Sequence, residues 1–235
     1  MQAFTREEFE QAERLCLQRG RWGNADVWRV SLRGAWAVKD FSRRARFFRC
    51  VFGVWLVARE YRIVKALDGV FATGDGAFRL DRYAFAEPFF EGRPLRRMKP
   101  GDAGVPFFER LEAAVRGMHA KGVVHLDLRN GGNILMDLDG TPRVLDFQSA
   151  IGTRWLPGAI RQRLEWIDLS GVYKHWARLA PQTMGEARER ILLWQVRNRK
   201  WWRVRGYRFS PIQRSLKPFE HELLRKYNES QAEDS

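Results

Sequence analysis

The stretch VVHLDLRNGGNILMDLDGTPRVLDF, residues 123–147, sets acidic and amide side chains among aliphatic residues and glycines. Its short apolar runs, residues 133–136 and 143–145, are predicted strands joined by a turn at Asp139-Gly140. Asp127 lies in the loop before the first strand, and Asp146 directly follows the second. Because neighbouring strands bring their ends together, we expect these two acids to face one site.

The chain before this stretch predicts a helix that leads directly into it. Apolar side chains recur at helical spacing from Phe107 to Met118. The pattern stops at Lys121-Gly122, and a cation followed by glycine is typical of a helix C-terminus.

The N-terminal part predicts strands around a single helix. Residues 26–41 alternate apolar and polar side chains and turn at Arg33-Gly34, which predicts a β-hairpin. Residues 43–67 predict a helix, and residues 78–90 have a strand-like composition that ends near Pro88 and Gly92. From about Ile160 onward the chain is predicted to be helical again.

The length and charge limit the class of protein. The 235 residues accommodate one large domain or two small lobes that share a cleft. The net charge of +14 predicts an anionic partner, which nucleic acid, an acidic membrane surface or a phosphorylated substrate would each satisfy. Cys16 and Cys50 are too few for a disulfide framework or a zinc site, as in a reducing cytoplasm.

Neither a secretory signal nor a membrane span is expected. Residues 1–15 are charged and contain no apolar core of the kind that signal peptides have. The strongest apolar run, residues 51–58, is far too short to cross a bilayer. We therefore expect a cytoplasmic protein that is soluble or peripheral on a membrane.

The polar residues of the opening stretch suit phosphoryl transfer, which needs a cation on the phosphates, oxygen ligands for magnesium and a carboxylate near the accepting hydroxyl. Asn133 and Asp146 offer oxygen donors that suit Mg²⁺. Asp127 would accept the proton of the attacking hydroxyl, and the Arg129 guanidinium would neutralise the transferred phosphoryl group.

Residues 118–136, MHAKGVVHLDLRNGGNILM, together with VLDF at residues 144–147, resemble the catalytic and metal-binding loops of the protein-kinase-like superfamily. The atypical features are most similar to those of small bacterial lipopolysaccharide kinases of the Kdo and heptose kinase type, with RIO-type kinases nearby. The resemblance implies an α+β, two-lobed fold with ATP and Mg²⁺ as cofactors. Residues 1–90 would form a mostly β N-lobe with one helix, and residues 91–235 a mainly helical C-lobe.

The resemblance also implies a role for individual residues. His125-x-Asp127 matches the catalytic-loop motif, Asn133 the metal-binding asparagine and Asp146-Phe147 the start of the D-F-G motif. Lys39 matches the strand lysine that contacts the phosphates, Glu60 its partner on a helix, and Asp168 the helix aspartate that braces the catalytic loop. The nucleotide-binding set is completed by Gly20 and Gly23 in a loop between strands, and by Glu87.

The chain departs from the kinase pattern in its loops. The spacing from Asp127 to Asn133 is one residue longer than usual, so residues 130–132 must bulge, which the glycines at 131 and 132 permit. Gln148 replaces the D-F-G glycine, no A-P-E motif is present, and the nucleotide loop has only two glycines. These departures argue against a regulated eukaryotic-type protein kinase.

The acceptor remains open between two classes. The resemblance implies a hydroxyl of a lipopolysaccharide core sugar or related glycolipid at the cytoplasmic face of the inner membrane. A Ser/Thr protein acceptor is the alternative. An inactive nucleotide-binding scaffold is the other class of function.

Two segments combine cations with aromatic side chains. Residues 197–208 interleave cations with Trp201, Trp202 and Tyr207, as residues 43–49 do with Phe47 and Phe48. Such segments are typical of surfaces that bind an anionic membrane. Binding of single-stranded nucleic acid and a basic face that is only solvated are the alternatives.

Overall fold

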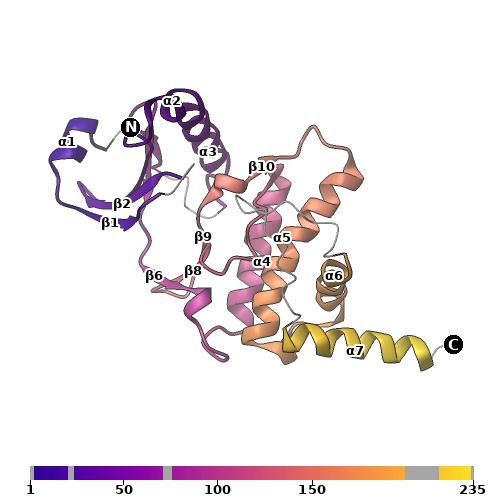
Figure 1. Cartoon of the computed structure of the whole chain (residues 1–235). Coiled ribbons are helices and arrows are strands. Elements are labelled where there is room, and N and C mark those ends of the chain that lie inside the picture. Colours follow the sequence, from indigo (N-terminus) through magenta and orange to yellow (C-terminus); the bar gives the residue numbers. More distant parts are fainter. Residues whose placement is uncertain (1–2, 21–23, 71–75, 199–216, 234–235) are drawn as a thin grey trace.

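The computed structural model describes residues 3–20, 24–70, 76–198 and 217–233. It is an α+β structure with an antiparallel sheet in its N-terminal part and a helical C-terminal part, consistent with a two-lobed kinase-like fold. Figure 1 shows the sheet and its helices on one side, and α4 to α7 on the other. The fold class expected from the sequence is therefore confirmed.

The N-terminal sheet has five strands in the order β1-β2-β3-β5-β4, all paired antiparallel. The predicted hairpin is confirmed as β2 and β3, and Arg33 and Gly34 of its turn both have positive φ. The segment of strand-like composition at residues 78–90 forms two antiparallel strands, because the chain reverses between them. The strands are β1 (Arg14–Gln18), β2 (Asp26–Ser31), β3 (Ala35–Asp40), β4 (Phe78–Arg79) and β5 (Ala84–Pro88).

The helix predicted for residues 43–67 is present, in three consecutive pieces: α2 (Arg46–Phe48), the π-helical turn η1 (Arg49–Gly53) and α3 (Val54–Ala66). A further helix, α1 (Arg6–Gln11), covers the other face of the sheet through Phe9. Its start is fixed by a capping box in which Thr5 and Glu8 each accept a hydrogen bond from the other's backbone N–H.

The predicted lobe boundary near residue 90 falls between β5 and β6 (Gly92–Pro94). The helix predicted at residues 107–118 is α4 (Val105–Ala120), and the chain leaves it through Gly122 with a φ of 75°. The two strands predicted in the opening stretch are β8 (Ile134–Asp137) and β9 (Pro142–Val144), which pair with each other, while β6 pairs with β8. A second small sheet joins β7 (Val123–Val124) to β10 (Ile151–Gly152).

The C-terminal part is built on three longer helices, α5 (Gly158–Leu179), α6 (Glu186–Arg197) and α7 (Pro218–Glu233). Short 3₁₀ turns connect the elements: η2 (Leu95–Arg97), η3 (Phe147–Ser149) and η4 (Pro181–Thr183). No helix within the described residues is both long and apolar enough to cross a bilayer.

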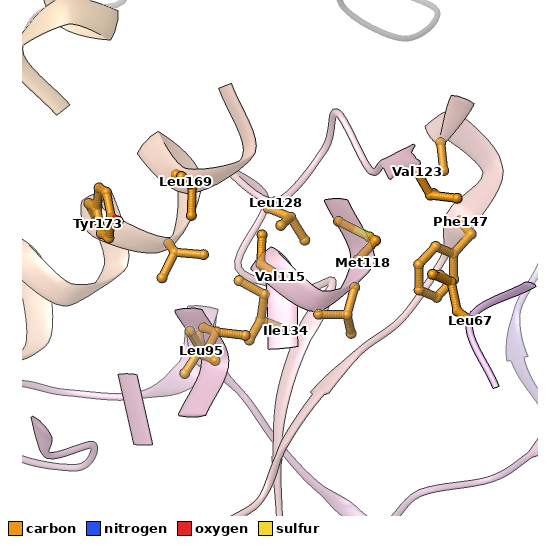
Figure 2. Close-up of a cluster of buried hydrophobic side chains, with 14 of the residues drawn as sticks. Leu67, Leu95, Val115, Met118, Val123, Leu128, Ile134, Phe147, Leu169 and Tyr173 are labelled. Carbon is orange, nitrogen blue, oxygen red and sulfur yellow. The ribbon is translucent and has the colours of Figure 1, made fainter. Parts of the chain in front are cut away.

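One hydrophobic core runs through both parts of the molecule. It includes Val57 and Phe85 from the N-terminal part and Val115, Met118 and Tyr173 from the helices beyond. Figure 2 shows Leu67, from the turn after α3, beside Phe147 and near Met118. Apolar packing thus fixes the loops within residues 123–147, and it orders the polar side chains that these loops carry.

Candidate active site

The catalytic-loop segment, residues 125–133, is held by its backbone from α5. The carboxylate of Asp168, fully buried, accepts hydrogen bonds from the N–H groups of His125 and Leu126, both at 2.7 Å. It also accepts one from Nε2 of His119 at 3.1 Å. Leu126 has a φ of 66°, a conformation that costs a branched residue energy and persists because its N–H is fixed in this way. Asp168 therefore stands where the kinase resemblance expects a brace.

Two further residues of α5 hold the carbonyl groups of the same loop. The Lys174 ammonium donates to the Arg129 carbonyl at 2.6 Å, and Nε2 of His175 donates to the Leu128 carbonyl at 3.1 Å. Burial lowers the pKa of Lys174 to about 8 and that of His175 to about 3, so His175 is a neutral imidazole. Gly171 lets the helix approach this closely, because a Cβ there would lie 2.8 Å from the Leu128 carbonyl carbon.

The longer loop between Asp127 and Asn133 keeps these two side chains together. Nδ2 of Asn133 donates to Oδ2 of Asp127 at 2.8 Å and to its carbonyl at 3.2 Å. The extra residue is taken up by two successive turns, in which Asn130 N–H donates to Asp127 O and Asn133 N–H donates to Asn130 O. The Asn130 side chain bridges them by donating to Asn133 Oδ1 at 3.2 Å. The bulge therefore does not displace Asn133 from Asp127.

Asp146 follows β9 in the left-handed conformation, with φ 62° and ψ 73°. Its side chain is half exposed, and Oδ1 lies 3.3 Å from the Lys39 ammonium. His125 joins this segment to the catalytic loop: its Nε2 donates to the Leu145 carbonyl at 3.1 Å, and its Nδ1 accepts from Asp127 N–H at 3.3 Å. His125 therefore braces the backbone of both segments.

The two aspartates have opposite pKa shifts. The Lys39 ammonium holds the pKa of Asp146 below its usual value and keeps the carboxylate ionised. Partial burial raises the pKa of Asp127, although hydrogen bonds from Asn133 and Asn130 oppose that rise. Asp146 is thus suited to binding a cation, and Asp127 to exchanging a proton.

Lys39 of β3 lies among three carboxylates. Its ammonium forms a buried hydrogen-bonded ion pair with Glu60 of α3 and lies 4.0 Å from Glu87 of β5. Burial alone would lower the pKa of Lys39, but Glu60, Asp146 and Glu87 outweigh that effect and raise it, so the lysine is charged. Burial raises the pKa of Glu60 and raises that of Glu87 to about 7. The structure therefore brings the three sequence-predicted residues from β3, α3 and β5 to Asp146.

The predicted nucleotide loop is partly described. Gly20 N–H donates to Asp26 at 2.8 Å and its carbonyl accepts from Arg44, while a Cβ at Gly20 would overlap the Asn24 carbonyl. Gly20 is thus required for this loop to close, and Gly23 lies outside the described residues.

Gln148, in place of the D-F-G glycine, links that loop to the segment that contains Asp146. Its side-chain amide donates to Asn24 at 3.2 Å, and its carbonyl accepts from Arg59 of α3. The segment between Asp146 and the start of α5 is short, residues 147–157, and contains η3 and β10.

Arg129 is placed on the α5 side of the catalytic loop. Its guanidinium donates to the Ser170 hydroxyl at 3.3 Å and to Glu220 of α7 at 3.3 Å. Glu220 is buried, with only 2% of its surface exposed. The contact of Arg129 with a transferred phosphoryl group stays a prediction.

The donor set fits a magnesium ion shared with phosphates. Asn133 offers Oδ1 and Asp146 its carboxylate, both hard oxygen ligands. Among the residues that the structure describes, no group of three or more His, Cys, Asp or Glu side chains could hold a metal by itself. A magnesium that keeps waters and phosphate oxygens in its shell needs no such group.

Several residues of this site were not predicted from the sequence, namely Lys174, His175, Gly171 and Glu220. Gly171 carried a signal, since a glycine inside a helix costs stability and points to a close approach. The others are common residue types on helices, and the contacts they make span more than forty residues of sequence.

Comparison with known proteins gives one partial similarity. No family model matches the chain. A segment of 70 residues is 39% identical to the DNA damage-responsive serine/threonine-protein kinase RqkA of Deinococcus radiodurans. The matched segment covers 27% of this chain and 10% of that kinase, so the chain spans about a tenth of this relative. In that segment, therefore, the chain is similar to a serine/threonine-protein kinase.

Proposed function

We propose that this protein is an ATP-dependent kinase that transfers the γ-phosphoryl group to an alcohol hydroxyl. The observation that carries the proposal is the arrangement of two pairs: Lys39 with Glu60, and Asp127 with Asn133. The first pair reaches Asp146 through Lys39, and the N–H of Leu145, next to Asp146, donates to the Asn133 carbonyl of the second pair at 2.9 Å. Phosphoryl transfer depends mainly on positioning and on charge stabilisation, and these residues supply both. The similarity to a serine/threonine-protein kinase supports the same class of reaction.

Each residue of the site has a role in this reaction. Lys39, fixed by Glu60, binds the α- and β-phosphates, and Gly20 and Gly23 contribute to the loop beside them. Asp127 orients the acceptor hydroxyl and takes its proton as the new O–P bond forms and the bond to the leaving ADP breaks. Asn133 and Asp146 would hold magnesium, which would neutralise phosphate charge.

For the acceptor we propose a sugar hydroxyl of lipopolysaccharide or a related glycolipid, reached by a peripheral protein at the cytoplasmic face of the inner membrane. The resemblance of the catalytic and metal-binding loops to those of lipopolysaccharide kinases supports this acceptor, and the net charge of +14 suits an anionic lipid. A Ser/Thr protein acceptor is the second candidate, which the similarity to RqkA favours.

The test is transfer of labelled γ-phosphate from ATP to Kdo-lipid A, to total lipids and to a generic protein. Replacing Asp127 with Asn is expected to lower transfer by about a hundredfold or more, because it removes the proton acceptor. Asp139→Asn, an exposed aspartate of the neighbouring turn, is the matched control and should transfer normally. Label only in protein would reject the glycolipid acceptor, and no label in any acceptor would favour an inactive scaffold.

A further inference from the structure

The helix that carries Glu60 also exposes a run of large apolar side chains. Phe47 is 76% exposed, Trp55 53%, and Val51 and Phe52 are each 50% exposed. We call these four residues the N-lobe apolar stripe. Single exposed apolar residues are ordinary, whereas a contiguous group marks a contact surface. Elsewhere in the described residues, exposed large apolar side chains occur in ones and twos, as at Leu138 and Trp155.

The helical spacing places the stripe on one face. Phe47, Val51 and Trp55 follow at intervals of four residues across α2, η1 and α3, and Phe52 is next to Val51. The π-helical turn Arg49–Gly53 winds wider than an α-helix, so it keeps both Val51 and Phe52 exposed. The rings of Phe48 and Phe52 stack with their centroids 5.6 Å apart, and the Arg59 guanidinium lies 4.9 Å from the Trp55 ring centroid. The stripe is thus an ordered surface.

The charge around the stripe is of one sign. Residues 41–59 contain five arginines and no acidic residue. Arg44 and Arg49 bond inward, to Asp26 and to the Ser42 carbonyl. Arg46, next to Phe47 in the chain, and Arg43, whose guanidinium lies 5.3 Å from the Trp28 ring centroid, are both exposed. A surface that combines aromatic rings with uncompensated cations is complementary to a layer with anionic headgroups above hydrocarbon.

We propose that the N-lobe apolar stripe, with Arg43 and Arg46, docks this protein on an anionic lipid bilayer. Phe47, Phe52 and Trp55 insert to headgroup depth, and the two arginines meet the anionic headgroups. Docking needs no phosphoryl transfer and rests on the proposed function only for its purpose, which is to bring the kinase to a glycolipid acceptor.

The stripe is joined directly to the site. Arg59 contacts the Trp55 ring on one side and donates to the Gln148 carbonyl on the other. Its neighbour Glu60 pairs with Lys39. The helix that meets the bilayer is therefore the helix that fixes the phosphate-binding lysine.

Vesicle co-sedimentation tests the docking surface. Wild-type protein is expected to bind phosphatidylcholine vesicles that contain phosphatidylglycerol and to leave pure phosphatidylcholine vesicles unbound. The double variant Phe47→Ser, Trp55→Ser should bind the vesicles with phosphatidylglycerol at least about tenfold more weakly than the wild type, because two inserted rings are lost. Arg46→Glu should weaken binding as well, and the control Trp155→Ser, at a 79% exposed tryptophan of the other lobe, should bind as wild type.

Cys50, exposed within the same helical segment, provides a second measurement. With Cys16 replaced by Ser, a polarity-sensitive fluorophore on Cys50 should shift to shorter wavelength when phosphatidylglycerol vesicles are added. Unchanged emission, equal binding by the double variant, or binding to single-stranded RNA instead of vesicles would each overturn the proposal. The Asp127→Asn protein should dock as wild type, so loss of transfer and loss of docking are distinguishable.

Discussion

Asp168 shows how a single buried carboxylate fixes the catalytic loop. It accepts three hydrogen bonds, two from successive backbone N–H groups and one from His119, and it is fully buried. One of those N–H groups belongs to Leu126, the residue with positive φ immediately before Asp127. The orientation of Asp127, the proposed proton acceptor, therefore depends on a side chain that need not touch any substrate.

Replacing Asp168 with Asn is expected to destabilise the protein by about 1–3 kcal/mol, because one buried N–H group loses its acceptor. Phosphoryl transfer should fall further than stability alone explains, since Leu126 is released from its strained conformation. Denaturant unfolding together with the transfer assay checks both effects. Asp139→Asn, at an exposed position, serves as control, and an unchanged transfer rate in folded Asp168→Asn protein would refute the bracing role.

Glu87 gives the molecule a pH dependence with a definite sign. Burial raises its pKa to about 7, above the ordinary value near 4.3, so the folded protein holds this proton more tightly than the unfolded chain does. Its contribution to stability is present below the unfolded pKa and is lost as the pH rises through 7. Relative to Glu87→Gln, wild-type protein should lose about 2–3 kcal/mol of unfolding free energy between pH 5 and pH 8. Denaturant titrations at both pH values measure this difference, and a constant difference would contradict it.

At the scale of elements, α5 acts as the support of the catalytic loop. Asp168, Lys174 and His175 hold four residues of the loop by their backbone groups, namely His125, Leu126, Leu128 and Arg129, and Gly171 allows the contact. The C-terminal helix α7 adds a second support, since Glu220 pairs with Arg129 of the same loop. Both helices thus position the catalytic loop.

Substituting Gly171 with Ala is expected to destabilise the protein by about 1–3 kcal/mol and to reduce transfer, because the new Cβ would meet backbone atoms at 2.8 Å. The matched control is Gly117→Ala in α4, where the Cβ would meet Val70 at an ordinary 3.5 Å. That substitution should be neutral or stabilise by up to about 1 kcal/mol, as alanine does in helices. Thermal unfolding of the two variants separates the outcomes, and equal effects would exclude the close approach as the cause.

Elements with strong local patterns could be predicted from the sequence, and their relations in space could not. The hairpin at residues 26–41 and the helix ending at Lys121-Gly122 follow from alternation, helical spacing and glycine. The helix α1 was not predicted, although the capping-box pattern of Thr5 and Glu8 indicates a helix start there. The closure of the loop from Asp127 to Asn133 depends on hydrogen bonds of the Asn130 and Asn133 side chains, for which no periodic pattern exists.

At the scale of the whole molecule, a continuous core joins the two lobes. Phe147 is 1% exposed and belongs to the same buried cluster as Val57 and Phe85 of the N-terminal part and Met118 of α4. Side chains from the two lobes therefore pack in the same hydrophobic core. Because unfolding either lobe would expose this core, we expect the lobes to unfold together.

Replacing Phe147 with Ala should destabilise the protein by about 3–5 kcal/mol and reduce hydrogen-exchange protection in β3 and in α4 alike. The control Leu138→Ala, at a side chain that is 83% exposed, should leave protection unchanged. Loss of protection in only one of the two elements would show that the lobes unfold separately.

The short segment between Asp146 and α5 bears on how such an enzyme would be controlled. Residues 147–157 contain a 3₁₀ turn, a paired strand and a connection of only five residues, 153–157, and Gln148 is tied to both Asn24 and Arg59. That leaves no length for a loop that a modifying enzyme could fold or release. The activity of the proposed kinase would therefore depend on its location. The rate of phosphoryl transfer would follow the number of protein molecules bound to the membrane beside their acceptor, and the lipid composition of that membrane would set this number.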